Sequence, residues 1–235
     1  MKSVLLEYLE QSEKRRQEQR RTKPVITLSR AFGCPAKDLA LELLPLLEAR
    51  TRKQGHDTDE ERPRWSWVSK SIIAEAAQEL ELDPEQVAEE RHERRVSLLG
   101  DLLHSFSSHY VPTTEAIRQT IAQVVGGYAE HGYVVMIGRG AEIITRARPN
   151  TFHLRLVAPE VWRVERTMEQ RKLAFLDEAY RLVRQQDMER AHFRESFADG
   201  KNVCELFDMQ LDASRFTVPQ MAELVMLAMD KLGVG

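Results

Sequence analysis

Short apolar runs that alternate with helical patterns are the feature that most constrains this chain. Residues 24–29 (PVITLS), 133–137 (YVVMI) and 152–157 (FHLRLV) are short and rich in apolar and β-branched residues, which is typical of strands. The weaker run at 207–211 (FDMQL) predicts a fourth strand. Strands that alternate with helices are usually joined by parallel crossover connections. We therefore expect an α/β fold with an open parallel sheet and helices on both faces.

Apolar residues at helical spacing fill the intervals between these strands. Leu39, Leu43, Leu44 and Leu47 predict a helix after the first strand. Further helices are predicted at 68–80, from Asp83-Pro84 to about 95, from Thr113 or Thr114 to about 131, at 141–148, at 175–197 and after Thr217. Another helix opens at Ala158-Pro159-Glu160, where we expect the proline at the first helical position.

The remaining segments divide the chain. Residues 1–23 predict a charged helical extension, which either contacts an anion or partner or is a solvated arm. Residues 24–235 then form a single domain. Residues 51–64 contain no apolar side chain and predict an exposed connection, 65–68 (WSWV) is either a short strand or a docking point, and 98–112 is ambiguous.

Charge and composition exclude several classes of protein. Lys and Arg together number 34 against 37 Asp and Glu, so the net charge of −3 argues against a nucleic-acid-binding protein. Two cysteines, Cys34 and Cys204, are too few for a disulfide scaffold and fit a reducing compartment. No long uncharged apolar window occurs, so we expect no membrane span and a cytoplasmic protein.

The loop after the first strand could bind phosphate, because open parallel sheets bind ligands at the carboxyl ends of their strands. Gly33 permits an unusual backbone, Lys37 opens the following helix and Arg30 flanks the loop. Of the pattern G-x-x-x-x-G-K-[ST], however, only Lys37 matches. Ala31 and Ala36 stand at the glycine positions, Pro35 removes an N–H donor, and Asp38 replaces the hydroxyl that binds magnesium. The residues alone leave a phosphate cradle and a plain turn equally open.

Gly138-Arg139-Gly140 follows the strand 133–137 directly. Two glycines free the backbone, so that Arg139 can be aimed across the strand ends toward a phosphate or carboxylate. The alternative is a turn whose arginine pairs with a surface acid.

Arg184, Asp187, Arg190 and Arg194 share one face of the long helix at 175–197. Such a face could close over a charged ligand as a lid, or it could be ion-paired helix surface. The histidines do not combine with cysteines or carboxylates at metal-ligand spacing, so we assign no metal ligands. Cys34 is either a reactive thiol at a helix start or a packing residue.

Several of these segments, in this order, resemble the cytidylate kinase-like family. VITLSRAFG with its Lys-bearing helix resembles the family's phosphate loop, VSKSIIAEAAQELELDPEQVAEERHERR its helical insertion, and YVVMIGRGAEII its strand ending in Gly-Arg-Gly. HLRLVAPEVWRVERTM resembles the strand and helix that follow, and DMERAHFRESF with FDMQLDASRFTV the lid and last strand. The resemblance implies a P-loop kinase-like fold with five parallel strands, an insertion at about 51–112 and a helical lid at about 172–204.

The resemblance also implies an activity and its residues. The family transfers the γ-phosphoryl group of ATP, with Mg²⁺, to a nucleoside monophosphate such as CMP or dCMP. Lys37 would contact the β- and γ-phosphates, Arg139 would bind the acceptor phosphate, and Asp187 with Arg190 would contact the acceptor from the lid. Lys37, Arg139 and Arg190 are thereby the expected catalytic residues. The expected nucleotide-binding set adds Arg30, Gly33, Gly138, Gly140, Arg184 and Asp187.

The chain departs from the family pattern at several positions. Cys34-Pro35-Ala36 replaces a Gly-rich stretch, Asp38 replaces a hydroxyl residue and Ser69 replaces an aspartate. Two functions therefore stay open. One is a nucleoside monophosphate kinase, and the other is a kinase-like protein that binds a nucleotide, another anion or a protein partner without catalysis.

Overall fold

The computed structural model describes residues 22–53, 63–79, 114–198 and 206–235. Most of the predicted N-terminal extension lies outside these residues, as do the helix expected from Asp83-Pro84, the ambiguous segment 98–112 and the last part of the expected lid.

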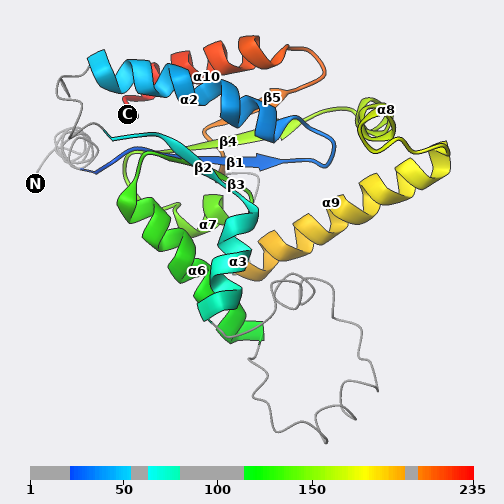
Figure 1. Ribbon diagram of the computed structural model, residues 1–235, viewed down its shortest axis with the longest axis horizontal. Coiled ribbons are helices and arrows are strands. Elements are labelled where there is room, and N and C mark those ends of the chain that lie inside the picture. Colours follow the sequence, from blue (N-terminus) through cyan, green and yellow to red (C-terminus); the bar gives the residue numbers. More distant parts are fainter. Residues whose placement is uncertain (1–21, 54–62, 80–113, 199–205) are drawn as a thin grey trace, which may run out of the picture.

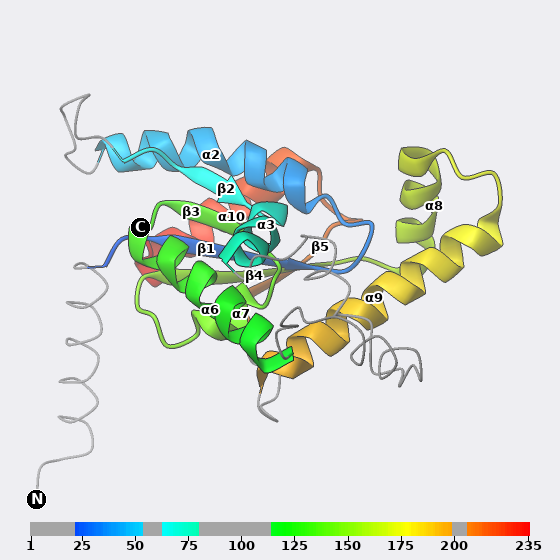
Figure 2. The same cartoon turned by 60° about the horizontal axis from the view of Figure 1, so that its bottom comes forward.

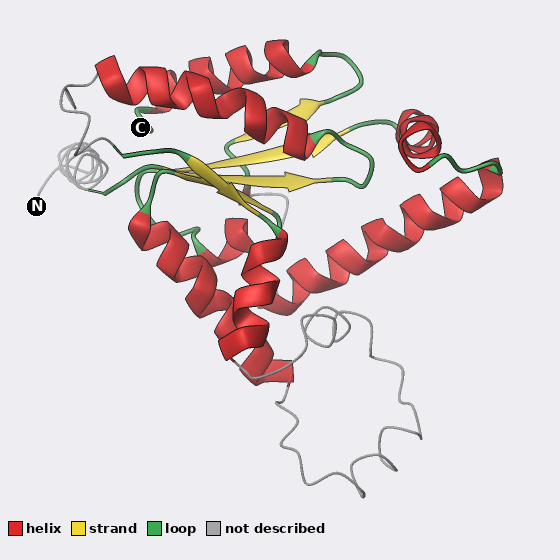
Figure 3. Cartoon of the chain, viewed as in Figure 1, coloured by secondary structure: helices red, strands yellow, loops and turns green. Residues whose placement is uncertain are grey.

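Five parallel strands form one sheet in the order β2-β3-β1-β4-β5. The strands are β1 Val25–Arg30, β2 Ser66–Val68, β3 Val134–Ile137, β4 Thr151–Val157 and β5 Met209–Asp212. The expected α/β architecture is confirmed (Figure 3). The segment around Trp67 is an edge strand, and the weak fourth run is β5, beginning two residues later than predicted.

Helices cover both faces of the sheet (Figure 1). On one face lie α2 (Ala36–Lys53) and α10 (Val218–Leu232), which pack against each other. On the other face lie α3 (Lys70–Glu79), α6 (Thr114–His131) and α7 (Ala141–Ile144). Among the described helices, none is long and apolar enough to cross a membrane.

The strands place their side chains alternately into two cores. Ile26 and Leu28 of β1 pack toward α2 and α10, whereas Val25 packs toward α3 and α6. This period of two is the geometry of a pleated strand, and it explains why the strands carry apolar residues at successive positions. The carboxyl ends of the strands are thereby fixed from both sides.

Two helices extend beyond the sheet. Helix α8 (Glu160–Arg171) follows β4, and α9 (Leu176–Ala198) runs back from α8 to contact α7 (Figure 2). A third apolar cluster joins them, in which Phe32 from the loop after β1 packs with Val164 of α8 and with Ala179 and Val183 of α9. The loop that could bind phosphate is therefore attached to this helical pair.

Three helix ends test the sequence predictions. Thr217 caps α10 as expected, and its hydroxyl and Gln220 form a complete capping box. Pro159 is the N-cap of α8, so the prediction that it occupies the first helical position is wrong by one residue. Helix α7 ends at Ile144, four residues early, because the chain continues in turns and Pro149 disfavours a helical Arg148.

Candidate functional site

A cavity of about 730 Å³ opens at the carboxyl ends of β1, β2 and β3. The loop after β1, Trp67 to Ser69 and the helical pair α8–α9 form its walls. Its lining includes four cationic side chains, namely Arg30, Lys37, Arg171 and Arg190, and none of the described residues that line it is an aspartate or glutamate. Such a balance of charge favours an anionic ligand.

The N-terminus of α2 faces this cavity. Ala36 and Lys37 line it, and the amide of Leu39 is already bound by the Pro35 carbonyl at 3.0 Å. The amides of Lys37 and Asp38 belong to the first helical turn, which has no preceding helical carbonyls to bind. These amides and the helix dipole add positive potential beside the Lys37 ammonium.

Gly33 lets the loop pack closely against α8. Its φ of +88° lies in the left-handed region, and a Cβ at this position would be 2.9 Å from the Arg163 carbonyl oxygen and 3.2 Å from Thr167 Oγ1. Both the backbone angle and the space therefore require glycine. Gly33 thus positions the loop and also lines the cavity.

Two aromatic rings line the cavity, and cations stack on both. The guanidinium carbons of Arg190 and Arg171 lie 5.1 and 5.4 Å from the centroid of the Phe32 ring. The Lys37 ammonium lies 5.6 Å from the centroid of Trp67. These contacts hold the cations at the cavity wall and bring planar apolar surfaces next to the positive charges.

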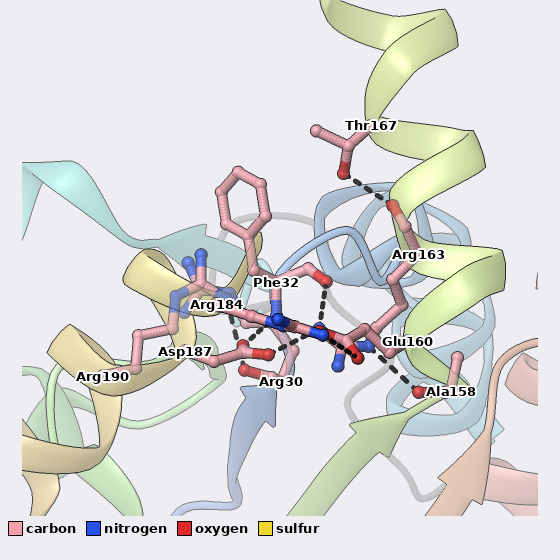
Figure 4. A network of polar contacts seen from close by, with 9 residues as sticks. All are labelled: Arg30, Phe32, Ala158, Glu160, Arg163, Thr167, Arg184, Asp187 and Arg190. Atoms are coloured by element: carbon pink, nitrogen blue, oxygen red, sulfur yellow. Dashed lines mark hydrogen bonds and ion pairs between the residues drawn. The ribbon is translucent and has the colours of Figure 1, made fainter. Parts of the chain in front are cut away.

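A polar network holds α8, α9 and the loop after β1 together (Figure 4). The Arg163 guanidinium donates to the Ala158 carbonyl at 3.0 Å, the Phe32 carbonyl at 3.1 Å and Asp187 Oδ2 at 2.5 Å. Asp187 Oδ1 accepts the Phe32 amide at 2.7 Å. Asp187, expected to contact an acceptor nucleotide, is therefore bonded to the loop and to Arg163.

Arg190 and Arg184 are both on α9, but only Arg190 lines the cavity. Arg190 lines the cavity and donates to the Arg30 carbonyl at 3.2 Å, so α9 brings it to the end of β1. Arg184 does not line the cavity. It donates to Glu160 at 2.6 Å and lies over the Tyr180 ring, and this hydrogen bond lowers the pKa of the exposed Glu160 carboxyl.

The Gly138-Arg139-Gly140 turn is left-handed at all three residues, with φ angles of 72°, 64° and 68°. Gly138 lies against Arg30, because a Cβ there would collide with Arg30 Nη1. Arg139 has a left-handed backbone conformation, which costs free energy for any residue except glycine. Strained residues of this kind are common at functional sites. It lies at the end of β3 but is outside the described cavity lining.

A buried carboxylate lies behind the cavity wall. Glu142 of α7 is 1% exposed, and burial raises its pKa, while Arg194, a hydrogen bond from Ser29 and Arg30 oppose this rise. Arg194 also donates to Ser29 Oγ at 3.4 Å. The fourth member of the predicted α9 series, Arg194, therefore faces the sheet.

Cys34 lines the cavity as a half-buried free thiol. Burial raises its pKa to about 11, and the nearby Arg163 opposes the rise only in part. A thiol with this pKa is almost fully protonated at neutral pH, so this environment disfavours the reactive-thiol interpretation.

Several cavity residues were missed at the sequence level, namely Phe32, Trp67, Thr167, Gln170 and Arg171. A helical pattern could have suggested part of this set, since Arg163, Thr167, Gln170 and Arg171 share one face of α8 at spacings of three, four and eight residues. Phe32 and Trp67 carried no comparable signal, because aromatic residues beside strands usually belong to the core.

The described residues near Lys37 do not fit the Mg²⁺ that the resemblance implies. Magnesium prefers carboxylate oxygens and water. Asp38 is paired with Arg166 at 3.1 Å, and Asp187 is bonded to Arg163 and Phe32. Across the described ranges, no group of three His, Cys, Asp or Glu side chains could hold a metal ion.

Comparisons with solved structures support the fold. An uncharacterized protein from Eubacterium ventriosum ATCC 27560 superimposes with a TM-score of 0.59 at 15% identity, over 89% of this chain and 99% of that one. Shikimate kinase from Acinetobacter baumannii, solved with shikimate, gives a TM-score of 0.50 at 11% identity, over 91% and 97%. At these identities the likeness shows the fold alone, which is the expected P-loop kinase-like fold. A comparison with curated protein sequences gave no match.

The sequence itself matches a family. Residues 61–215, well over half of the chain, match the cytidylate kinase-like family. The match begins after β1 and its loop, so it covers the Gly-Arg-Gly turn, α8 and α9 but not Lys37. This chain therefore belongs to the cytidylate kinase-like family.

Proposed function

We propose that the cavity binds nucleotides and that the protein transfers the γ-phosphoryl group of ATP to a nucleoside monophosphate of the CMP or dCMP kind. The observation that carries the proposal is the charge of the cavity. Four cations, from β1, α2, α8 and α9, converge on it at the strand ends, and no carboxylate occurs among its described lining residues. The family membership supports the same chemistry.

The cations come from four different elements around the cavity, which suits a ligand with several phosphates. Lys37 belongs to the first turn of α2, whereas Arg171 of α8 and Arg190 of α9 contact the Phe32 ring. In the proposed reaction an oxygen of the acceptor phosphate attacks the γ-phosphorus, the bond to the β,γ-bridging oxygen breaks, and ADP leaves. Positioning and charge neutralisation dominate such catalysis.

Arg139 and Asp187 have supporting roles in this proposal. Arg139 would bind the acceptor phosphate, for which its strained position at the end of β3 is the structural support. Asp187 would fix Arg163 and the loop, in keeping with its two hydrogen bonds. The aromatic side chains of Phe32 and Trp67 add apolar surface to the cavity, which suits a nucleotide better than an inorganic anion.

A second candidate function is nucleotide binding without transfer. The observation that favours it is the Asp38–Arg166 ion pair, because a P-loop enzyme has a hydroxyl that binds magnesium at this position. The same cavity would then serve recognition of the nucleotide in a regulatory role. We assign Mg²⁺ no step in either function.

A coupled ADP-release assay across CMP, dCMP and the other nucleoside monophosphates tests the first function. We expect turnover with a pyrimidine monophosphate that falls at least tenfold in Lys37→Ala, about what losing one charge-assisted contact costs. Thermal-shift measurements with the same nucleotides run in parallel. Stabilisation without turnover would establish the second function. The absence of both stabilisation and turnover would contradict both functions.

A further inference from the structure

We infer that this cavity binds the phosphates of a nucleotide without a metal ion. The cations of the protein then take the place that a divalent metal has in P-loop kinases. The inference rests on the proposed function in that the ligand is a nucleotide. It goes beyond that function in stating how the charge of the ligand is neutralised.

The charge of the lining is the first step. Arg30, Lys37, Arg171 and Arg190 surround the cavity, and its described lining contains no acidic side chain. A bound Mg²⁺ would cancel two of the negative charges that these cations attract. It would also lie among four positive charges, with no carboxylate in the described lining to offset the repulsion.

The carboxylates of Asp38 and Asp187 are the second step, because both are already paired with arginines. Asp38 is paired with Arg166 at 3.1 Å, and Asp187 accepts from Phe32 and Arg163. At each of these carboxylates a metal ion would compete with the positive charge of an arginine.

The hydroxyl groups of the lining lie outside the phosphate loop, on α8 and after β2. Thr167 Oγ1 donates to the Arg163 carbonyl at 2.6 Å, and Ser69 Oγ donates to the Ile137 carbonyl at 3.4 Å. Ser69 follows the end of β2 and Thr167 is on α8, so neither hydroxyl belongs to the phosphate loop. The loop itself has Asp38 where a P-loop places its metal-binding hydroxyl.

Cation–π contacts are the third step. The Phe32 ring contacts both Arg171 and Arg190, and the Trp67 ring contacts Lys37. Three like charges are thus kept near the cavity before any ligand arrives. An arrangement that is preorganised in this way needs no metal ion to assemble it around a polyanion.

Calorimetric titration of the full chain with ATP tests the inference, once with excess Mg²⁺ and once with EDTA at the same ionic strength. We expect ATP to bind at least as tightly in EDTA as in Mg²⁺. In EDTA, Arg171→Gln should weaken binding about tenfold, Arg171→Lys should restore most of it, and the exposed Arg181→Gln on α9 should leave it unchanged. Thermal unfolding of each variant confirms that it is folded.

The possible outcomes separate the two proposals. Binding that is at least about tenfold tighter with Mg²⁺ than with EDTA would overturn the inference and leave the proposed function standing. An equal loss of affinity in Arg171→Gln and Arg181→Gln would overturn it too, because the cavity cations would then act only through net charge. Binding in neither buffer, to ATP or to CMP, would overturn the proposed function and this inference with it.

Discussion

The Asp187 carboxylate on α9 accepts the backbone amide of Phe32 at 2.7 Å, across 155 positions of sequence. Its other oxygen accepts Arg163 of α8, whose guanidinium also binds the Phe32 carbonyl. One carboxylate thus fixes the loop after β1 and the two helices beyond the sheet in a single arrangement. The position of Lys37 and Arg190 around the cavity depends on this arrangement.

Replacing Asp187 by alanine should destabilise the fold by about 1–3 kcal/mol, the usual cost of leaving charged hydrogen-bonding partners unsatisfied. Urea denaturation measures this free energy of unfolding. Glu195→Ala is the matched control, because Glu195 is an exposed carboxylate on the same helix. Equal unfolding free energies for the two variants would show that Asp187 does not fix the loop.

Gly138→Ala should weaken nucleotide binding by displacing Arg30. The new methyl group would collide with Arg30 Nη1, and the φ of +72° adds a backbone cost of about 1 kcal/mol. Gly127→Ala is the control, since no atom lies within 4 Å of its added Cβ and alanine favours the helix interior. Titration with ATP compares the two variants. If the folded Gly138→Ala variant bound ATP with unchanged affinity, Arg30 would not contribute to nucleotide binding.

His153 should make the fold less stable in mild acid. It is 3% exposed and bonded through Nδ1 to Thr27 Oγ1 at 2.7 Å, and burial lowers its pKa from 6.5 to about 4, although Asp208 opposes the shift. The unfolded chain binds this proton first, so stability is full above pH 6.5 and falls as the pH drops toward 4. The loss should reach about 3 kcal/mol.

Denaturation of the protein and of His153→Asn across this pH window isolates the histidine from other acid effects. The asparagine variant is less stable at neutral pH but should show a flatter dependence between pH 6.5 and 4. Parallel curves for the two proteins would mean that His153 titrates normally.

Cys34 should react slowly with iodoacetamide in the folded protein. Because burial raises its pKa from 9.0 to about 11, its thiolate fraction at neutral pH is about a hundredfold lower than that of an ordinary cysteine. Mass spectrometry of a Cys204→Ser variant follows this thiol alone. Equal labelling rates with and without urea would show that the fold does not suppress the reactivity of the Cys34 thiol.

The sheet could be predicted from the sequence because its strands are short, apolar and bounded by glycine or proline. The runs at 24–29, 133–137 and 152–157 became β1, β3 and β4 within a residue or two. The N-cap of α10 at Thr217 could also be predicted, since its capping partner Gln220 is only three residues away. These features depend on neighbours in the sequence.

The site was only partly predictable, because its residues meet through contacts between distant segments. Lys37, Arg30 and Gly33 follow a strand end, and Arg190 has helical spacing, so local rules pointed to them. Neither the Asp187–Phe32 bond nor the exclusion of Arg184 from the cavity has a local signal, because both depend on how α9 packs against α8. The same holds for Arg171 and the Phe32 ring.

The affinity of Lys37→Ala for ATP, measured by calorimetry, tests the central claim most directly. Lys53→Ala is the matched control, because Lys53 is an exposed lysine at the opposite end of α2. We predict that Lys37→Ala binds about ten- to a hundredfold more weakly than the unaltered protein, whereas Lys53→Ala binds equally well. Equal affinities for both variants and the unaltered protein would contradict the account, because the cavity would then not be the nucleotide site.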